Sequence, residues 1–249
     1  MLLDTYMGGR LQGARVFVGG VGPGLGSAVV YFALLEGARV FAVARSRDFL
    51  ERLRRELSGL GELHVGAYDL SRPESAEAAV AEAASKLGGL DAVVVTAGGY
   101  VEAPIDALDP AVLEEMLSRN LKAHLYAVRA AVRRLKPGSS IVLVTAVGGA
   151  YPAWLRNNAA YVSSKAALAR AVEALAAELA ERGIRVNGVA PGGMRKDFAP
   201  GRDWRRERRL GDPQAPPEDV ARVIIWLLTD ESYWVNGAVI PVDGGRRLL

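Results

Sequence analysis

Short apolar runs alternate with longer amphipathic stretches along almost the whole chain. The apolar runs are a few residues long and rich in valine, leucine, isoleucine and alanine, which is typical of strands buried on both faces of a parallel sheet. About seven strands are expected, at Arg15–Val18, Ala38–Ala44, Leu63–Ala67, Asp91–Thr96, Ser140–Thr145, Ile184–Ala190 and Ala238–Val242. The alternation predicts an α/β fold, with a doubly wound parallel sheet and helices on both of its faces.

The stretches between the apolar runs predict helices. Asp109 and Pro110 have the residue types of an N-cap and a first-turn proline, and the helix that they begin is expected to end near Leu135. Further helices are expected from the glycine turn to Glu36, over Pro73–Leu87, from Tyr161 to just before Gly183, and over Glu218–Leu228. Residues 192–217 fit no element, and a connection of that length is often a substrate lid. We expect a single domain over residues 1–249.

Composition narrows the classes of function. The 249 residues contain no cysteine, and their two histidines, His64 and His124, lie far apart, so neither a thiol nucleophile nor a metal site is expected. The chain begins without the basic and apolar segments of a signal peptide, and no apolar run approaches the ~18 residues that span a bilayer. A net charge of +3 with interleaved acidic residues does not indicate a nucleic-acid partner. We expect a cytoplasmic protein that binds neither membrane nor nucleic acid.

A glycine-rich turn, Gly19–Gly26, follows the first expected strand and opens a helix. Glycines at such a turn let the backbone approach a pyrophosphate closely, and the helix N-terminus faces the negative charge. The expected contacts are Gly20, Gly24, Leu25 and Gly26. A plain strand-to-helix turn is the alternative interpretation, because a lone glycine motif is a weak signal.

The second expected strand ends at Ala44 and is followed by Arg45 and Ser46. A dinucleotide site reads the adenosine ribose near this offset, usually with an acidic residue. Here a cation replaces the acid, which favours a 2′-phosphate and therefore NADP(H), with NAD(H) as the weaker candidate. A solvated arginine at a strand end is the alternative.

Tyr161 and Lys165 lie four residues apart in one expected helix, so both side chains can face the same cleft. A nearby cation favours the phenolate and lowers the pKa of a tyrosine from its ordinary value of ~10, which would make Tyr161 a usable acid or base. The same spacing also arises by chance, as a packed tyrosine beside a solvated lysine.

Taken together and in this order, the motifs resemble those of the short-chain dehydrogenase/reductase family over essentially the whole chain. Gly20, Gly24 and Gly26 match its glycine motif, Asp69-Leu70 its adenine contact, and Ala97-Gly98 the second half of its Asn-Asn-Ala-Gly motif. Asn120 matches its active-site asparagine, Tyr161 and Lys165 its signature, Pro191-Gly192 its nicotinamide-side turn, and Asp243-Gly244-Gly245 its usual ending.

The resemblance implies a Rossmann-like fold and hydride transfer between a nicotinamide cofactor and a small carbonyl or alcohol. Tyr161 would be the general acid/base, Lys165 would tune it and hold the nicotinamide ribose, and Asn120 would position a relay water. Met194 joins the expected cofactor contacts after the Pro191-Gly192 turn. The family also implies a homo-oligomer, either a tetramer or a dimer.

Several positions depart from the family pattern. Gly19 stands where a threonine is usual, Val95 and Thr96 replace two asparagines, and Lys196 replaces a threonine. The catalytic serine is expected at Ala146, with Thr145 beside it. Three interpretations stay open: Thr145 replaces the serine, a loop donor or water does so, or the protein binds cofactor with little turnover.

Neighbouring side chains of a regular strand point to opposite faces, so Thr145 can take the place of the serine only if the strand is distorted there. Gly148 and Gly149 permit such a bulge. The replacement of the serine by Thr145 is therefore a prediction about local backbone geometry.

Basic residues crowd the expected lid at Arg195, Lys196, Arg202, Arg205, Arg206, Arg208 and Arg209. They either recruit an anionic acyl thioester, such as a carrier-protein or coenzyme A derivative, or form a solvated surface offset by Asp197, Asp203 and Glu207. The sequence thus predicts an NADP(H)-dependent reductase or dehydrogenase that interconverts a carbonyl and a secondary alcohol, with 3-oxoacyl thioesters as a candidate substrate class. The alternative is a non-catalytic or weakly active dinucleotide-binding or redox-sensing protein.

Overall fold

The computed structural model describes residues 8–153 and 155–249, and its centre is one parallel sheet. The strand order is β3-β2-β1-β4-β5-β6-β7. The bounds are β1 (Arg15–Gly19), β2 (Arg39–Ala44), β3 (Leu63–Ala67), β4 (Ala92–Val95), β5 (Ser140–Val144), β6 (Arg185–Pro191) and β7 (Val239–Val242). The doubly wound α/β fold is therefore confirmed. The order reverses between β1 and β4, and ligands of such sheets bind at the carboxyl ends of the strands beside that point.

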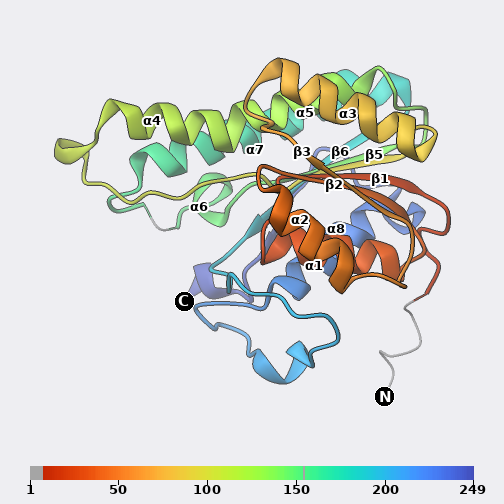
Figure 1. Ribbon diagram of the computed structural model, residues 1–249. Helices are drawn as coiled ribbons and strands as arrows, with labels where there is room; N and C mark the ends of the chain where they lie inside the picture. Colours follow the sequence, from red (N-terminus) through yellow and green to blue (C-terminus); the bar gives the residue numbers. More distant parts are fainter. Residues whose placement is uncertain (1–7, 154) are drawn as a thin grey trace.

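Helices cover both faces of the sheet (Figure 1). One face carries α1 (Leu25–Leu35), α2 (Arg47–Glu56) and α8 (Pro217–Leu228); the other carries α3 (Pro73–Leu87), α5 (Ala123–Val132) and α7 (Ala159–Leu179), with α4 (Pro110–Leu117) and the short α6 (Val147–Ala150) beyond. Alternate strand residues serve the two layers, since Val16 and Val18 pack towards α1 while Phe17 packs towards α3. Each full burial of this kind is worth about 1.5–3 kcal/mol. No helix in the described ranges is long and apolar enough to cross a membrane.

The helix expected to run unbroken from Pro110 to about Leu135 is wrong in its middle and at its end. Asp109 does cap α4 and accepts a hydrogen bond from Ala111 N, but a π-helical turn over Ser118–Lys122 then separates α4 from α5, which ends at Val132. A π-turn widens the helix by one residue and often occurs at functional positions. Here it directs Asn120 inwards, fully buried.

The segment 192–217 is irregular apart from a turn at Trp204–Glu207, and it projects below α1 and α8 in Figure 1. Two aromatic contacts fix it to α1, since Phe198 lies 5.3 Å from Tyr31 and Trp204 lies 5.5 Å from Phe32 between ring centroids. Both contacts hold the segment against α1, which packs on the sheet.

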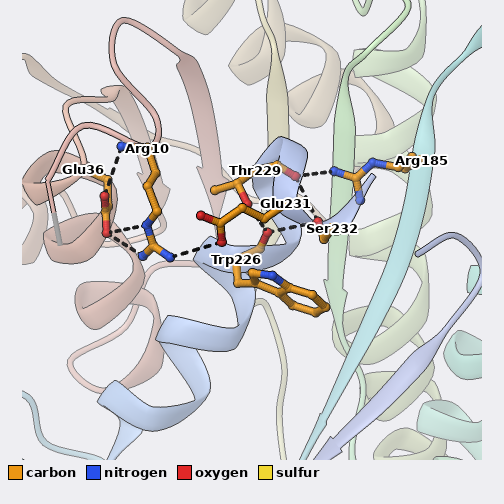
Figure 2. A network of polar contacts seen from close by, with 7 residues as sticks. All are labelled: Arg10, Glu36, Arg185, Trp226, Thr229, Glu231 and Ser232. Carbon is orange, nitrogen blue, oxygen red and sulfur yellow. Dashed lines mark hydrogen bonds and ion pairs between the residues drawn. The ribbon is translucent and has the colours of Figure 1, made fainter. Parts of the chain in front are cut away.

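Arg10 joins its own segment to Glu36, which follows α1, and to Glu231, which follows α8, as Figure 2 shows. Arg10 Nη2 donates to Glu36 Oε1 at 2.5 Å, and Arg10 Nη1 lies 3.8 Å from Glu231 Oε2. The Glu36 side chain is almost fully buried, so this pair compensates a charge that would be costly alone.

The end of α8 is held by side chains, also visible in Figure 2. Thr229 and Ser232 donate from their hydroxyls to Trp226 O, and Arg185 Nη2 donates to Thr229 O at 3.1 Å. The last carbonyls of a helix have no partner within it, and these donors satisfy them. Arg185 therefore joins α8 to β6, which carries the Pro191-Gly192 turn.

Candidate active site

Two adjoining cavities lie at the carboxyl ends of the strands. A cavity of about 340 Å³ is lined by Gly20, Arg45, Asp69 and Leu70, and one of about 1160 Å³ by Gly24, Leu25, Thr145, Tyr161, Lys165, Pro191, Gly192 and Met194. Pro23, Ala97, Gly98 and Arg119 line both. The two cavities thus form one elongated cleft, and it collects all of the expected site residues except Gly26, Ser46 and Asn120.

The glycine turn is shaped for close approach. Gly20 has φ +76°, and a Cβ there would lie 2.3 Å from Ala97 N, so no other residue fits. Gly24 precedes α1, with the Arg195 and Lys196 backbone 3.3 Å from where its Cβ would be. Gly26 instead packs against Val21, because its Cβ would lie 2.6 Å from Val21 Cα. Gly26 therefore has a packing role and does not line the cleft.

At the other end of the cleft, Arg45 is exposed and lines the small cavity. Ser46 is the N-cap of α2 and accepts from Phe49 N at 3.3 Å, a use that the sequence did not suggest. Asp69 Oδ1 accepts from Ser71 N and Oγ at 3.0 and 2.7 Å. Burial opposes ionisation of Asp69, but the Ser71 bonds together with the charges of Arg45 and Arg72 lower the pKa of that carboxyl.

Tyr161 and Lys165 both line the large cavity, as the four-residue spacing predicts. The expected lowering of the tyrosine pKa is wrong in this structure: burial, and then the Tyr100 phenol, raises the pKa of Tyr161 to about 12. Lys165 Nζ is directed to Val144 O, to which it donates at 2.8 Å. Burial lowers the pKa of Lys165 to about 7, so its own charge is disfavoured and cannot strongly stabilise a phenolate.

Asn120 lies behind the wall of the cleft. Its Oδ1 accepts from Gly99 N at 2.8 Å, and its Nδ2 donates to Gly99 O and Ser164 Oγ, both at 3.0 Å. The side chain thereby fastens the loop after β4 to α7. The relay role that the family resemblance implies for Asn120 stays a prediction.

Thr145 lines the large cavity, but its hydroxyl donates to Val189 O at 3.0 Å, as does its backbone N–H at 2.8 Å. A hydroxyl has one proton to donate, and here that proton serves β6. Ala146 lines the same cavity and is 2% exposed. For Thr145 to act on a substrate, its bond to Val189 would first have to be given up.

Comparisons with known proteins identify the family. A family model described as "Enoyl-(Acyl carrier protein) reductase" matches residues 20–247. A solved short-chain dehydrogenase/reductase from Serratia marcescens has a TM-score of 0.86 and 27% identity, over 96% of this chain and 99% of that one. The chain belongs to the short-chain dehydrogenase/reductase family.

Two further relatives carry more specific descriptions. A 3-oxoacyl-(acyl-carrier-protein) reductase from Thermotoga maritima is 31% identical over 95% of this chain and 98% of its own length. A short-chain dehydrogenase from Burkholderia cenocepacia, solved in complex with NADP, is 28% identical, with a TM-score of 0.85 over 95% of this chain and 99% of that one.

The structure explains two departures from the family's motifs. At Gly19, a Cβ would lie 2.6 Å from Leu70 Cδ1, so the Leu70 side chain occupies the space of the usual threonine. Thr96 stands in the asparagine position and donates to Gly20 O at 3.0 Å, which supports the turn from the neighbouring strand. Both departures thus preserve the turn by other contacts.

Three site residues were missed from the sequence. The Tyr100 ring meets Tyr161 edge-on at 4.9 Å, and the Tyr100 phenol is hydrogen-bonded to Asn158, which is buried in the cavity wall. His124 is fully buried and donates from Nε2 to Ala97 O at 2.8 Å. Burial, and then the charge of Lys165, lowers the pKa of His124 to about 3, so it is neutral. The available signal in the sequence was that Tyr100 directly follows the small residues after β4.

The acidic residues named as offsets in the basic segment do form ion pairs. Asp197 pairs with Arg202 at 2.6 Å, Asp203 with Arg206 at 2.9 Å, and Glu207 with Arg195 at 2.7 Å. These contacts favour the solvated surface over the recruitment of an anion. Lys196, by contrast, is exposed at the large cavity.

Proposed function

We propose that this protein is an NADP(H)-dependent oxidoreductase that interconverts a carbonyl group and a secondary alcohol. The observation that carries the proposal is that Tyr161 and Lys165 line one end of a continuous cleft whose other end holds Arg45. A bound nicotinamide cofactor would supply or accept the hydride, and family membership supports this reaction class.

The shape and charge of the cleft fit the cofactor. Gly20 lines the small cavity, and Gly24 lines the large cavity at the N-terminus of α1, where a pyrophosphate is favoured by the orphan N–H groups and the helix dipole. Arg45 would give a 2′-phosphate a charge-assisted hydrogen bond, while Ala44 offers no carboxylate to a ribose hydroxyl. The NADP-bound relative from Burkholderia supports the same preference.

The proton would come from Tyr161. A phenol whose pKa is near 12 is protonated at neutral pH, and that is the form needed to donate to a carbonyl oxygen as negative charge develops on it. Lys165 would bind the nicotinamide ribose from the cavity floor.

Substitution of Tyr161 by Phe tests the proposal. NADPH oxidation is followed with acetoacetyl-CoA, an aromatic ketone and a keto sugar, and NADPH binding is followed by fluorescence. Tyr161→Phe should keep NADPH affinity within a few-fold and lose measurable turnover, because only the proton donor is removed. Tyr126→Phe, a tyrosine of α5 that is not among the cavity-lining residues, is the matched control. Near-normal kcat in Tyr161→Phe would refute the mechanism.

For the substrate, we propose a 3-oxoacyl thioester, on the similarity to the Thermotoga reductase. The competing function is dinucleotide binding with little turnover. It is favoured by the absence of a hydroxyl at Ala146 and by the bond that the Thr145 hydroxyl already donates to Val189 O. Stoichiometric NADPH binding without turnover of any panel compound would establish that second function.

We also propose one nucleotide-binding domain over residues 1–249, with residues 192–217 closing over the substrate, and assembly into a homotetramer or homodimer. Family membership and the Ala/Leu-rich α7 support the assembly. Sedimentation at micromolar concentration tests it, and a monomer would contradict it.

A further inference from the structure

The glycine turn offers an anion few donors besides its backbone. Its side chains between the glycines, at Val21, Pro23 and Leu25, are apolar, and Pro23 has no backbone N–H. The two nearby hydroxyls are engaged, since Ser27 donates to Gly22 O at 2.8 Å and Thr96 donates to Gly20 O at 3.0 Å. A pyrophosphate beside this turn would therefore need a cation from another element.

One cation lies where the two cavities of the cleft meet. Among the arginines and lysines that the structure describes, Arg119 alone lines both cavities. Arg45 lines only the small cavity, and four other cations line only the large one, namely Arg156, Lys165, Arg195 and Lys196. A dinucleotide with its adenosine end beside Arg45 and its nicotinamide end beside Lys165 would have its pyrophosphate at this junction.

The local backbone explains why Arg119 reaches the cleft. It belongs to the π-helical turn Ser118–Lys122, which also directs its neighbour Asn120 inwards. Arg119 Cζ and Nε lie 3.0 Å from where a Cβ of Gly99 would be, so the guanidinium lies against the bare backbone of the loop after β4. A side chain at residue 99 would occupy the place of this group.

The guanidinium is oriented and still has donors to offer. Nη1 donates to Glu115 Oε1 at 2.6 Å, from one helical turn earlier, and the Arg119 side chain is 35% exposed. Nε and Nη2 make no hydrogen bond within the described part of the chain. An arginine with free N–H groups suits phosphate oxygens, which accept charge-assisted hydrogen bonds.

We propose that Arg119 binds the pyrophosphate of the nicotinamide cofactor, and that it does so for NADPH and NADH alike. The assignment rests on the proposed function, to which the cofactor belongs. Arg45 would distinguish the two cofactors because only NADPH carries a 2′-phosphate, whereas both carry the pyrophosphate. Arg119 transfers no proton and takes no part in the hydride step, so its contribution is to affinity.

Calorimetry with cofactor fragments tests the two arginines separately. ADP-ribose carries the pyrophosphate without a 2′-phosphate, and 2′-AMP carries the 2′-phosphate without a pyrophosphate. Arg119→Met should weaken the binding of NADPH, NADH and ADP-ribose about tenfold, and should change that of 2′-AMP less than about twofold. Arg45→Ala should do the reverse with the fragments, weakening 2′-AMP and leaving ADP-ribose unchanged.

Two further variants separate binding from a structural effect. Lys122→Met removes a cation of the same π-turn that pairs with Glu114 and lines neither cavity, so it should leave all four ligands within about twofold. Arg119→Lys keeps the charge but loses the planar fork, and it should recover part of the lost affinity. Added NaCl should weaken ADP-ribose binding more in the wild type than in Arg119→Met, because salt screens the contact that the variant lacks.

Unchanged ADP-ribose binding in Arg119→Met would overturn the assignment, and so would an equal loss for 2′-AMP, which indicates general damage to the cleft. If the variant keeps its NADPH affinity but shows a raised KM for acetoacetyl-CoA, Arg119 contacts the substrate instead, and the proposed function stands without this assignment. If the wild type binds neither NADPH nor NADH, both fail.

Discussion

Replacement of Lys165 by Met is expected to stabilise the protein at low pH while removing its proposed activity. Lys165 is only 4% exposed, and no described carboxylate pairs with it; Nζ donates to Val144 O instead. Burial lowers its pKa from the ordinary 10.5 to about 7. Methionine has a similar length and carries no charge, so it removes the cost of burying an ammonium group and keeps most of the packing.

The size of the effect follows from the pKa shift. One pKa unit corresponds to ~1.4 kcal/mol, so burial of the charged ammonium costs about 5 kcal/mol when Lys165 is protonated in both folded and unfolded chains. Loss of the bond to Val144 O offsets about 1–3 kcal/mol of the gain. A net stabilisation of about 2–4 kcal/mol is therefore expected near pH 6.

The sign of the pH dependence is fixed by the direction of the shift. Because the folded-state pKa is lower than the unfolded one, the unfolded chain holds a proton that the folded chain lacks between pH 7 and 10.5. The unfolding free energy of the wild type therefore rises with pH across that window, and the advantage of Lys165→Met shrinks towards zero near pH 9. Tyr161, whose pKa is raised, loses its contribution only above pH 10 and does not interfere.

Urea unfolding at pH 6, 7.5 and 9 measures this difference, with NADPH oxidation assayed in parallel. Lys86→Met, an exposed lysine of α3, is the control and should show no pH-dependent difference from wild type. A destabilised Lys165→Met at pH 6, or an advantage independent of pH, would show that the ammonium is not buried as described.

Three further predictions concern the cleft and its supports. Gly20→Ala should lose NADPH binding and more than about 2 kcal/mol of unfolding free energy, because its Cβ meets Ala97 N at 2.3 Å; a stable, cofactor-binding variant would contradict this. Arg202→Met should cost about 3 kcal/mol in urea unfolding, since it leaves buried Glu218 unpaired, whereas the exposed Arg206→Ala should cost less than about 1. Equal losses of stability in Arg202→Met and Arg206→Ala would contradict the special cost of leaving Glu218 unpaired. Arg45→Ala should weaken NADPH binding about 10–100-fold and leave NADH unchanged; an unaltered ratio would remove Arg45 from the site.

The sequence by itself determined the strands and the order of the motifs. Continuous apolar runs can be buried on both faces only in a covered parallel sheet, and the strands β1 to β7 follow those runs to within a residue or two. Local signals were equally direct where one residue's backbone decides the outcome, as at Asp109 capping α4 and Gly183 in the left-handed conformation after α7. The four-residue spacing also placed Tyr161 and Lys165 in one cavity.

The tertiary structure alone decided the chemistry of the site, because burial and hydrogen-bond partners come from residues distant in the sequence. The pKa of Tyr161 rises instead of falling, since burial and then the Tyr100 phenol both raise it. The hydroxyl of Thr145 is taken by Val189, 44 residues away on the next strand. Tyr100 reaches Tyr161 from the loop after β4, and the two rings meet edge-on at 4.9 Å. No local pattern encodes these contacts, because each depends on which strand ends the fold places side by side.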